Sequence, residues 1–250
     1  MKADNFYDLA KEQFAQGDYK EAISNYTNAI EEEPDESLFY KARGICKEEI
    51  NDYIGSIEDF NTALNLDPNC SNIHRLIGVS QYGLGKFKEA IHSYDTAINI
   101  NPSDSLAYIN RGACKAEIKN WTEAIKDYDQ AINIDPYNSI SYHNRGLNKK
   151  NLNDIDGAMS DYMEALKINP EDIYIHLSIA KTNFDLKKYQ LANQSYTRII
   201  EINPSHNESF YMRGYCNYRE NKLNQAISDW KKASQLGHKD AAKLLEKYST

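Results

Sequence analysis

The sequence lacks any long apolar run, and this absence excludes a membrane-spanning role. A transmembrane helix needs about 20 consecutive apolar residues, and no run in the chain approaches that length. Residues 1–6 lead directly into a helical pattern, without the apolar core of a signal peptide. The sequence therefore predicts a cytoplasmic protein with no membrane partner.

The chain also lacks an excess of positive charge. It contains 29 Lys and Arg against 37 Asp and Glu, a net charge of −8, which disfavours binding to a phosphate backbone. We therefore expect no nucleic-acid partner. The charge is uneven, because residues 1–125 carry 12 basic against 21 acidic side chains and residues 126–250 carry 17 against 16. The acidic half could attract a basic partner, although a merely solvated acidic surface is the simpler interpretation.

Proline is rare, and its spacing organises the chain. All six prolines lie 34 residues apart, at Pro34, Pro68, Pro102, Pro136, Pro170 and Pro204. Proline cannot continue a helix and restrains the residue before it, so each one predicts a helix end. A fixed period of this size indicates a repeat architecture.

Placing each proline at position 32 divides the chain into seven repeats. They span residues 3–36, 37–70, 71–104, 105–138, 139–172, 173–206 and 207–240. Within each repeat, apolar residues recur twice at helical spacing around a short polar turn, which predicts a first and a second helix. Position 4 is aromatic or His, positions 8 and 20 are small, position 24 is a large aromatic residue, and position 27 is Ala in six repeats. Small residues facing each other allow two helices to approach closely.

This 34-residue pattern resembles the tetratricopeptide repeat (TPR) family. The resemblance implies an all-α, right-handed superhelical solenoid in which the first helices line a concave groove that binds a protein or peptide. We expect one such solenoid over residues 1–250. The seventh repeat has His238 in place of proline, and an amphipathic stretch at about 239–248 follows it. That stretch predicts a helix that caps the open end of the array.

The four cysteines predict neither disulfides nor a metal site. Cys46, Cys114 and Cys216 share position 10 of repeats that are two or three apart. The axes of packed helices are about 8–10 Å apart. A disulfide needs Cα atoms within about 7 Å of each other, so equivalent cysteines two or three repeats apart are too distant to form one. Cys70 has no evident partner. All four are interpreted as small apolar residues.

Positions 7 and 23 vary together. Position 7 is Arg and position 23 is Asp in repeats 2, 4, 5 and 7, and neither occurs in repeats 1, 3 and 6. The residues concerned are Arg43 and Asp59, Arg111 and Asp127, Arg145 and Asp161, and Arg213 and Asp229. We expect a structural Arg–Asp pair within each of these repeats, because a buried Arg is rarely left unpaired. Shared ancestry of the four repeats is the alternative explanation.

No arrangement of residues predicts catalysis. The Gly-rich segment at residues 82–86 lacks the spacing and the Ser or Thr of a phosphate-binding loop, and the six His residues do not stand at ligand spacing from Cys or carboxylates. We therefore expect a protein that is not an enzyme and that uses no cofactor and no metal.

The resemblance assigns positions 2, 5, 6, 9, 12 and 13 of each first helix to the groove. Eleven of the 19 tyrosines occupy framework positions, six of the other eight fall on groove positions, and four of these six are in the last two repeats. The candidate binding residues are Arg75, Tyr82, Asn110, His143, Asn144, Tyr174, Leu177, Tyr211, Tyr215 and Tyr218. Clustered aromatic residues are typical of a binding hot spot. The alternative is that they pack against the capping helix or a neighbouring molecule.

Some TPR proteins bind the carboxylate tail of heat-shock chaperones through Lys, Arg and Asn at five groove positions. Only Arg75 and Asn110 could serve at the matching positions here, so that activity is not implied. The preferred hypothesis is a non-catalytic scaffold that binds a protein or peptide segment. The alternatives are a self-assembly module, which would form a homo-oligomer, and a regulatory subunit of an enzyme complex.

Overall fold

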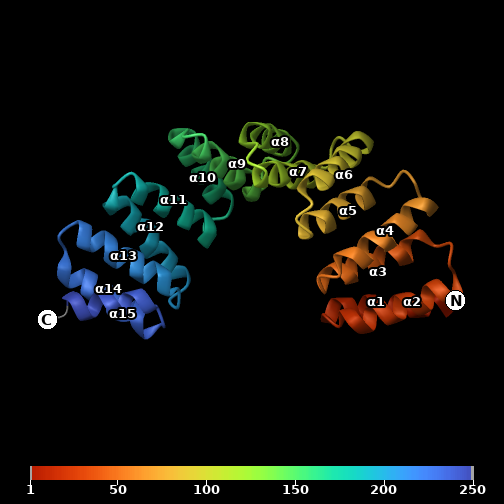
Figure 1. Cartoon of the computed structure of the whole chain (residues 1–250), viewed down its shortest axis with the longest axis horizontal. Helices are drawn as coiled ribbons and strands as arrows, with labels where there is room; N and C mark the ends of the chain where they lie inside the picture. The colour runs from red at the N-terminus through yellow and green to blue at the C-terminus, as the bar shows by residue number, and fades with distance from the viewer. Residues whose placement is uncertain (1, 249–250) are drawn as a thin grey trace. The chain divides into compact units, whose positions relative to one another are not determined.

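The computed structural model describes residues 2–248, and within them the chain forms fifteen α-helices and no β-strand (Figure 1). The first helices of the seven repeats are α1 (Lys2–Gln16), α3 (Ser37–Glu49), α5 (Ser71–Gly83), α7 (Ser105–Glu117), α9 (Ser139–Asn151), α11 (Ile173–Asp185) and α13 (Asn207–Arg219). The second helices are α2 (Tyr19–Glu32), α4 (Tyr53–Leu66), α6 (Phe87–Ile100), α8 (Trp121–Ile134), α10 (Ile155–Ile168), α12 (Tyr189–Ile202) and α14 (Leu223–Gln235). Helix α15 (Lys239–Tyr248) follows. The predicted all-α solenoid of seven helical hairpins and a C-terminal helix is confirmed.

The second helices end where the prolines predict. Helices α2, α4, α6, α8, α10 and α12 all end at position 30, two residues before the proline. The next first helix then begins behind a polar cap. Asp104 Oδ1, for example, accepts a hydrogen bond from the Ala107 amide at 3.2 Å, and Asn138 Oδ1 accepts one from the Ser141 amide at 3.1 Å. Such caps satisfy amides that have no partner inside the helix.

A second conformational constraint joins the two helices of each repeat. Position 15 has a positive φ in all seven repeats, at Gly17, Asn51, Gly85, Lys119, Asn153, Lys187 and Asn221. The left-handed region is accessible to Gly and tolerated by Asn, but it costs other L-residues about 1–2 kcal/mol. The tight turn therefore imposes this conformation even where the residue is Lys.

The position-24 ring and the position-8 residue of a repeat are in close contact. Gly146 illustrates it, since a Cβ built there would lie 2.7 Å from Tyr162 Cε1 and 3.1 Å from the Ala158 carbonyl oxygen. Ala158 and Tyr162 are both fully buried. The glycine thus makes room for the aromatic ring as well as for the facing helix backbone.

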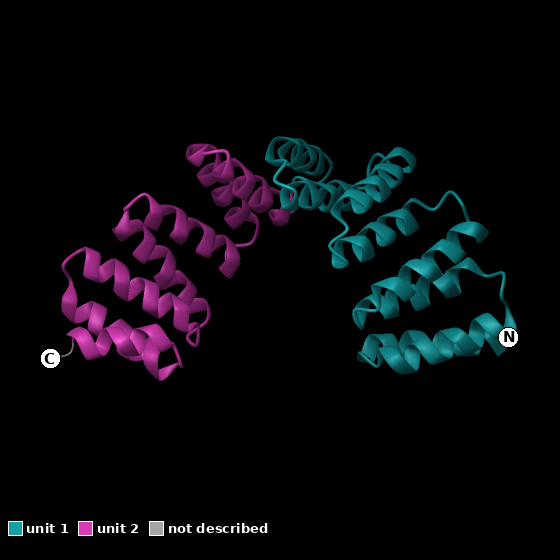
Figure 2. Cartoon of the chain, in the orientation of Figure 1, with its two compact units in different colours: residues 1–136 teal, residues 137–250 magenta. Residues whose placement is uncertain are grey.

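The helices form two compact units, residues 1–136 and residues 137–250 (Figure 2). Unit 1 contains helices α1 to α8, and unit 2 contains α9 to α15. That residues 1–250 form a single domain stays a prediction, and residues 1, 249 and 250 lie outside the described part of the chain.

Helix α15 caps unit 2 as the sequence predicts. Ala241 is buried, and Leu244, Leu245 and Tyr248 pack against Trp230 and its neighbours. The replacement of proline by His238 has a physical reason. The His238 amide donates to the Ala233 carbonyl oxygen at 2.9 Å, and its Nδ1 accepts from the Ala241 amide at 3.2 Å. Proline has no amide hydrogen and could not make the first of these bonds.

We predict that Lys119→Gly stabilises the protein by about 0.5–1 kcal/mol, because relief of the left-handed strain exceeds the added freedom of the unfolded chain. Urea unfolding followed by circular dichroism measures the change. Lys126→Gly, in the interior of α8, is the control and is expected to cost about 1 kcal/mol. Destabilisation by both substitutions would show that the turn at residue 119 carries no strain.

Candidate functional site

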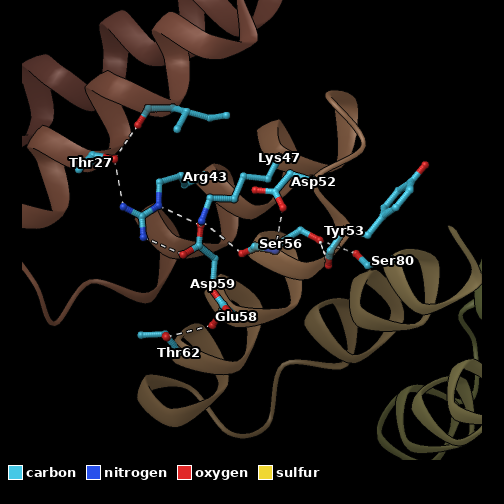
Figure 3. A network of polar contacts seen from close by, with 12 residues as sticks. Thr27, Arg43, Lys47, Asp52, Tyr53, Ser56, Glu58, Asp59, Thr62 and Ser80 are labelled. Atoms are coloured by element: carbon cyan, nitrogen blue, oxygen red, sulfur yellow. Dashed lines mark hydrogen bonds and ion pairs between the residues drawn. The ribbon is translucent and has the colours of Figure 1, made fainter. Parts of the chain in front are cut away.

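Arg43 connects three helices of unit 1 through its guanidinium group (Figure 3). Its Nε and Nη2 donate to the two carboxylate oxygens of Asp59 at 2.9 and 2.7 Å. Its Nη1 donates to Thr27 Oγ1, in the preceding repeat, at 3.0 Å. Lys47 lies 2.9 Å from Asp59 Oδ2 and completes the ion-pair cluster. Because Asp59 is buried, these donors replace the water that its charge would otherwise need.

The other three repeats with Arg at position 7 have the same geometry. The distances from Nε and Nη2 to the aspartate oxygens are 3.0 and 2.6 Å for Arg111, 2.9 and 2.6 Å for Arg145, and 3.0 and 2.6 Å for Arg213. Position 11 again supplies a third donor, through Lys115 and Lys149 to their aspartates and through Asn217 Nδ2 to Asp229. We call Arg at position 7 with its partners at positions 11 and 23 the arginine cluster. The sequence pattern predicted the Arg–Asp pairs but not the third donor at position 11.

Repeats 1 and 3, which lack the arginine, carry a neutral hydrogen-bonded set at the same positions. In repeat 1, Asn25 Nδ2 donates to Gln13 Oε1 at 2.8 Å, and in repeat 3 Ser93 Oγ donates to Gln81 Oε1 at 2.7 Å. Position 7 is then aliphatic. Charged and neutral sets are therefore alternatives, because a buried aspartate without its arginine would be left unpaired. Both sets join the first helix of a repeat to its second helix.

We predict that Arg43→Ile alone costs about 3 kcal/mol, since Asp59 keeps its charge and loses its bidentate partner. The triple variant Arg43→Ile, Lys47→Gln and Asp59→Ser copies the neutral set of repeat 3 and should recover most of the loss. Chemical denaturation of both variants tests this. If the triple variant is no more stable than the single one, the two sets are not equivalent solutions.

The candidate residues of unit 1 are held by neighbouring side chains. Arg75 Nε lies 3.2 Å from Asp104 Oδ2, at the cap of the following first helix. Tyr82 donates its hydroxyl to Glu117 at 3.2 Å and packs edge-on against Phe87. Asn110 is half-buried. Arg75 therefore acts in joining two repeats, whereas Tyr82 and Asn110 keep part of their surface exposed.

Glu48, at groove position 12, was missed by sequence reasoning. Its carboxylate accepts a hydrogen bond from the Ser80 hydroxyl, and Ser56 Oγ lies 2.8 Å from Ser80 Oγ. Burial raises the pKa of Glu48 to about 6, although the bond from Ser80 opposes the shift. No sequence signal distinguishes this residue from the exposed Glu49 beside it, because its burial comes from the neighbouring repeat.

We predict that Glu48→Gln stabilises the protein at pH 7 and has little effect at pH 4.5. The folded chain holds this proton more tightly than the unfolded chain, so the contribution of Glu48 is favourable at low pH and is lost as pH rises through about 6. The shift from about 4.5 to about 6 corresponds to about 2 kcal/mol, which we halve to about 1 kcal/mol because the carboxylate is partly solvated. Thermal unfolding across this pH range measures the effect, with Glu49→Gln as the exposed control. A pH-independent difference would contradict it.

In unit 2, the half-buried His143 is hydrogen-bonded within the protein. The Ser178 hydroxyl donates to the Tyr174 carbonyl oxygen at 3.0 Å, so it accepts the 2.8 Å hydrogen bond from His143 Nε2. Burial lowers the pKa of His143 and keeps the ring neutral at pH 7. Asn144 is half-buried, and its carbonyl oxygen accepts from Asn148 Nδ2 at 2.8 Å.

The aromatic candidates of repeats 6 and 7 separate into two groups. Tyr174 is 74% exposed on α11. On the same helix, the half-buried Leu177 and Phe184 pack into the core cluster of repeat 6. Phe184 lies 5.9 Å from the Tyr215 ring, which in turn lies 6.3 Å from Tyr218. We call Tyr174, Leu177, Phe184 and Tyr215 the aromatic surface.

Tyr211 and Tyr218 form the second group, and they contact the cap. Tyr211 stacks on His238 with ring centroids 4.2 Å apart. Tyr218 packs 5.2 Å from Tyr248, whose hydroxyl donates to that of Tyr218 at 3.2 Å. These two tyrosines therefore serve the alternative role that the sequence left open, which is packing against the capping helix.

Other groups that could carry chemistry do not form a site in the described chain. Within residues 2–248, no cluster of three or more His, Cys, Asp or Glu could hold a metal ion. Burial raises the pKa of the Cys46, Cys114 and Cys216 thiols to about 12, so they are protonated at neutral pH. None of the helices in this range is both long and apolar enough to span a bilayer.

Three family models described as tetratricopeptide repeat match the sequence. One matches residues 7–70, another 105–138, and the third 76–104, 140–172 and 173–206. The chain belongs to the tetratricopeptide repeat family. Proteins of this family are protein-interaction scaffolds, and their fold is typically non-catalytic. No protein of curated function matches the sequence of this TPR chain.

Solved structures of other TPR proteins share the fold. The C-terminal part of a TPR protein from Cytophaga hutchinsonii is 18% identical with a TM-score of 0.74, and the match covers 95% of this chain and 98% of that one. A TPR protein from Parabacteroides merdae is 16% identical with a TM-score of 0.72, covering 100% and 99%. YrrB, described as a TPR protein with an unusual peptide-binding site, is 17% identical with a TM-score of 0.61, covering 76% and 99%.

Proposed function

We propose that this TPR protein is a non-catalytic scaffold that binds a polypeptide segment on the aromatic surface of unit 2. The observation that carries the proposal is the exposure of Tyr174, which leaves about three quarters of a large aromatic side chain in water. Large aromatic side chains that are exposed on a protein surface are frequent anchors in interfaces. On the same helix as Tyr174, Phe184 contacts Tyr215 of the next first helix, with ring centroids 5.9 Å apart.

The charges on these helices indicate the kind of segment that fits. Lys181 on α11 and Arg219 on α13 are exposed, and Arg219 lies 5.0 Å from the Tyr189 ring. Asp185 is paired with Lys150 at 2.8 Å. Residues 137–250 carry 16 Lys and Arg against 13 Asp and Glu, a net charge of +3. A segment with aromatic or aliphatic side chains next to acidic ones matches this surface.

Among the polar candidates of unit 2, Asn144 can hydrogen-bond an extended ligand backbone. Within unit 1, Asn110 and Tyr82 offer groups of the same kind. Arg75 and His143 orient their neighbours, while Tyr211 and Tyr218 hold the edge of the surface against the cap.

A quantitative pull-down from the native lysate tests the proposal. Tyr174→Ala combined with Tyr215→Ala should lower the recovery of specific partners by about tenfold or more, because truncating such anchors costs about 2 kcal/mol or more. Tyr137→Ala, which removes another highly exposed tyrosine of unit 2, is the matched control.

Equal recovery by the double variant and the wild type would remove the aromatic surface as the binding site. Light scattering of the pure protein separates the alternatives. A concentration-dependent dimer that the double variant abolishes would identify self-assembly, and a catalytic partner recovered in fixed stoichiometry would identify a regulatory subunit.

A further inference from the structure

A depression of about 400 Å³ lies on unit 2, where α10, α11 and α12 meet. Met159, Met163 and Leu166 of α10, Ile179 of α11 and Leu191 of α12 supply its apolar lining. The polar lining consists of His176 and Asn183 of α11 and Gln194, Ser195 and Arg198 of α12. The lining is mostly apolar, although Met163 is 51% exposed and Leu191 45% exposed. Tyr174, Phe184 and Tyr215 are not part of it. This volume lies within the range of small-ligand and side-chain pockets.

The depression exists where an arginine cluster is missing. In repeat 7, the Arg213 guanidinium extends from Asp229 to Thr197 of the preceding repeat, at 2.6 and 3.2 Å. The equivalent residues in repeat 6 are Ile179, Ser195 and Met163. Ile179 is too short to extend between the two second helices. The corresponding hollow of repeat 7, about 320 Å³, is lined by Arg213, Asn217, Asp229 and other polar residues.

The Asn183 side chain indicates which kind of ligand the depression could bind. It is 4% exposed and lines the depression. The equivalent Asn217 donates to Asp229, but Ser195 turns its hydroxyl to the Leu191 carbonyl oxygen at 3.4 Å. Among residues 2–248, no side chain or backbone group hydrogen-bonds to the Asn183 side-chain amide, and its polar atoms still reach solvent. A polar group that lines a hollow and is not bonded within the protein can orient a ligand there.

The charge at the depression is paired within the protein. Arg198 of α12 lines it, pairs with Glu201 at 3.0 Å and lies 3.7 Å from Glu171. No aspartate stands at position 23 to receive a cation. Two flexible methionines suit an aliphatic partner, and the cores of protein interfaces are similarly poor in charge.

We propose that this depression is a second protein-binding site, which takes one aliphatic side chain from an uncharged segment of a partner polypeptide. A main-chain peptide group of that segment, which has one donor and one acceptor, pairs with the Asn183 amide. The site is independent of the aromatic surface. It would let the scaffold hold a second partner through α10 and α12 while the first occupies the aromatic surface.

Methyl NMR of the full chain labelled at its methionine methyl groups tests this site directly. Two of the four methionines, Met159 and Met163, line the depression, and Met212 of α13 lies in the same unit outside it. The probe is the blocked peptide acetyl-Gly-Gly-Leu-Gly-Gly-amide. Versions with Ala, Lys or Glu in place of Leu are the comparisons. We expect saturable shifts of the Met159 and Met163 signals with the Leu peptide alone, and no shift of Met212.

Two variants connect the binding to the proposed contacts. Asn183→Leu should lower the affinity for the Leu peptide by about fivefold, which corresponds to the loss of one hydrogen bond. The triple variant Met163→Thr, Ile179→Arg and Ser195→Asp copies Thr197, Arg213 and Asp229, and should abolish the shift of Met159. Circular dichroism melting verifies that both variants fold. The Tyr174→Ala and Tyr215→Ala double variant should bind the peptide normally, which separates this site from the aromatic surface.

Three outcomes would overturn the proposal. One is the absence of saturable shifts at Met159 and Met163 up to the solubility limit of the Leu peptide. Another is equal binding of the Lys or Glu peptide. The last is unchanged binding by the folded triple variant, which would show that the peptide binds elsewhere.

Discussion

The contact between the position-24 ring and the position-8 residue is the constraint on which each repeat depends. Tyr162 lies so close to Gly146 that no larger residue fits without movement of the ring. That contact sets the separation of the two helices, and the separation determines which other side chains can meet. Arg145 reaches Asp161 with both nitrogens only because the helices are held at this distance.

The arginine clusters show how a repeat array handles buried charge. Asp59, Asp127, Asp161 and Asp229 are all buried, and each is neutralised by an arginine and a further donor at position 11. The neutral sets in repeats 1 and 3 satisfy the same positions without charge. Repeat 6 is different, because Asn183 and Ser195 do not bond to each other. In repeat 6, these two side chains therefore line a surface depression instead of bonding the two helices to each other.

The framework also explains why so few tyrosines can be functional. Tyrosines at position 24 are buried, and Tyr211 and Tyr218 are used by the cap. Tyr137 and Tyr174 remain exposed, and of these two only Tyr174 lies on a first helix, whereas Phe184 and Tyr215 remain half-buried. The charge is also distributed between the units, since residues 1–136 carry 13 basic against 24 acidic side chains and residues 137–250 carry 16 against 13. The excess of acidic side chains is therefore in unit 1, whereas the aromatic surface is in unit 2.

The sequence by itself determined the repeat register, the helix ends and the partners at positions 7 and 23. Each of these follows from short-range rules repeated seven times, such as the break at proline and the need to pair a buried aspartate. The tertiary structure decided what depends on neighbouring repeats. Only in the fold does Glu48 become buried beside Ser80, does Arg75 reach Asp104, and does α15 cover Tyr218. Burial is a property of what packs on a residue, and at these positions the packing element lies about 30 residues away in the chain.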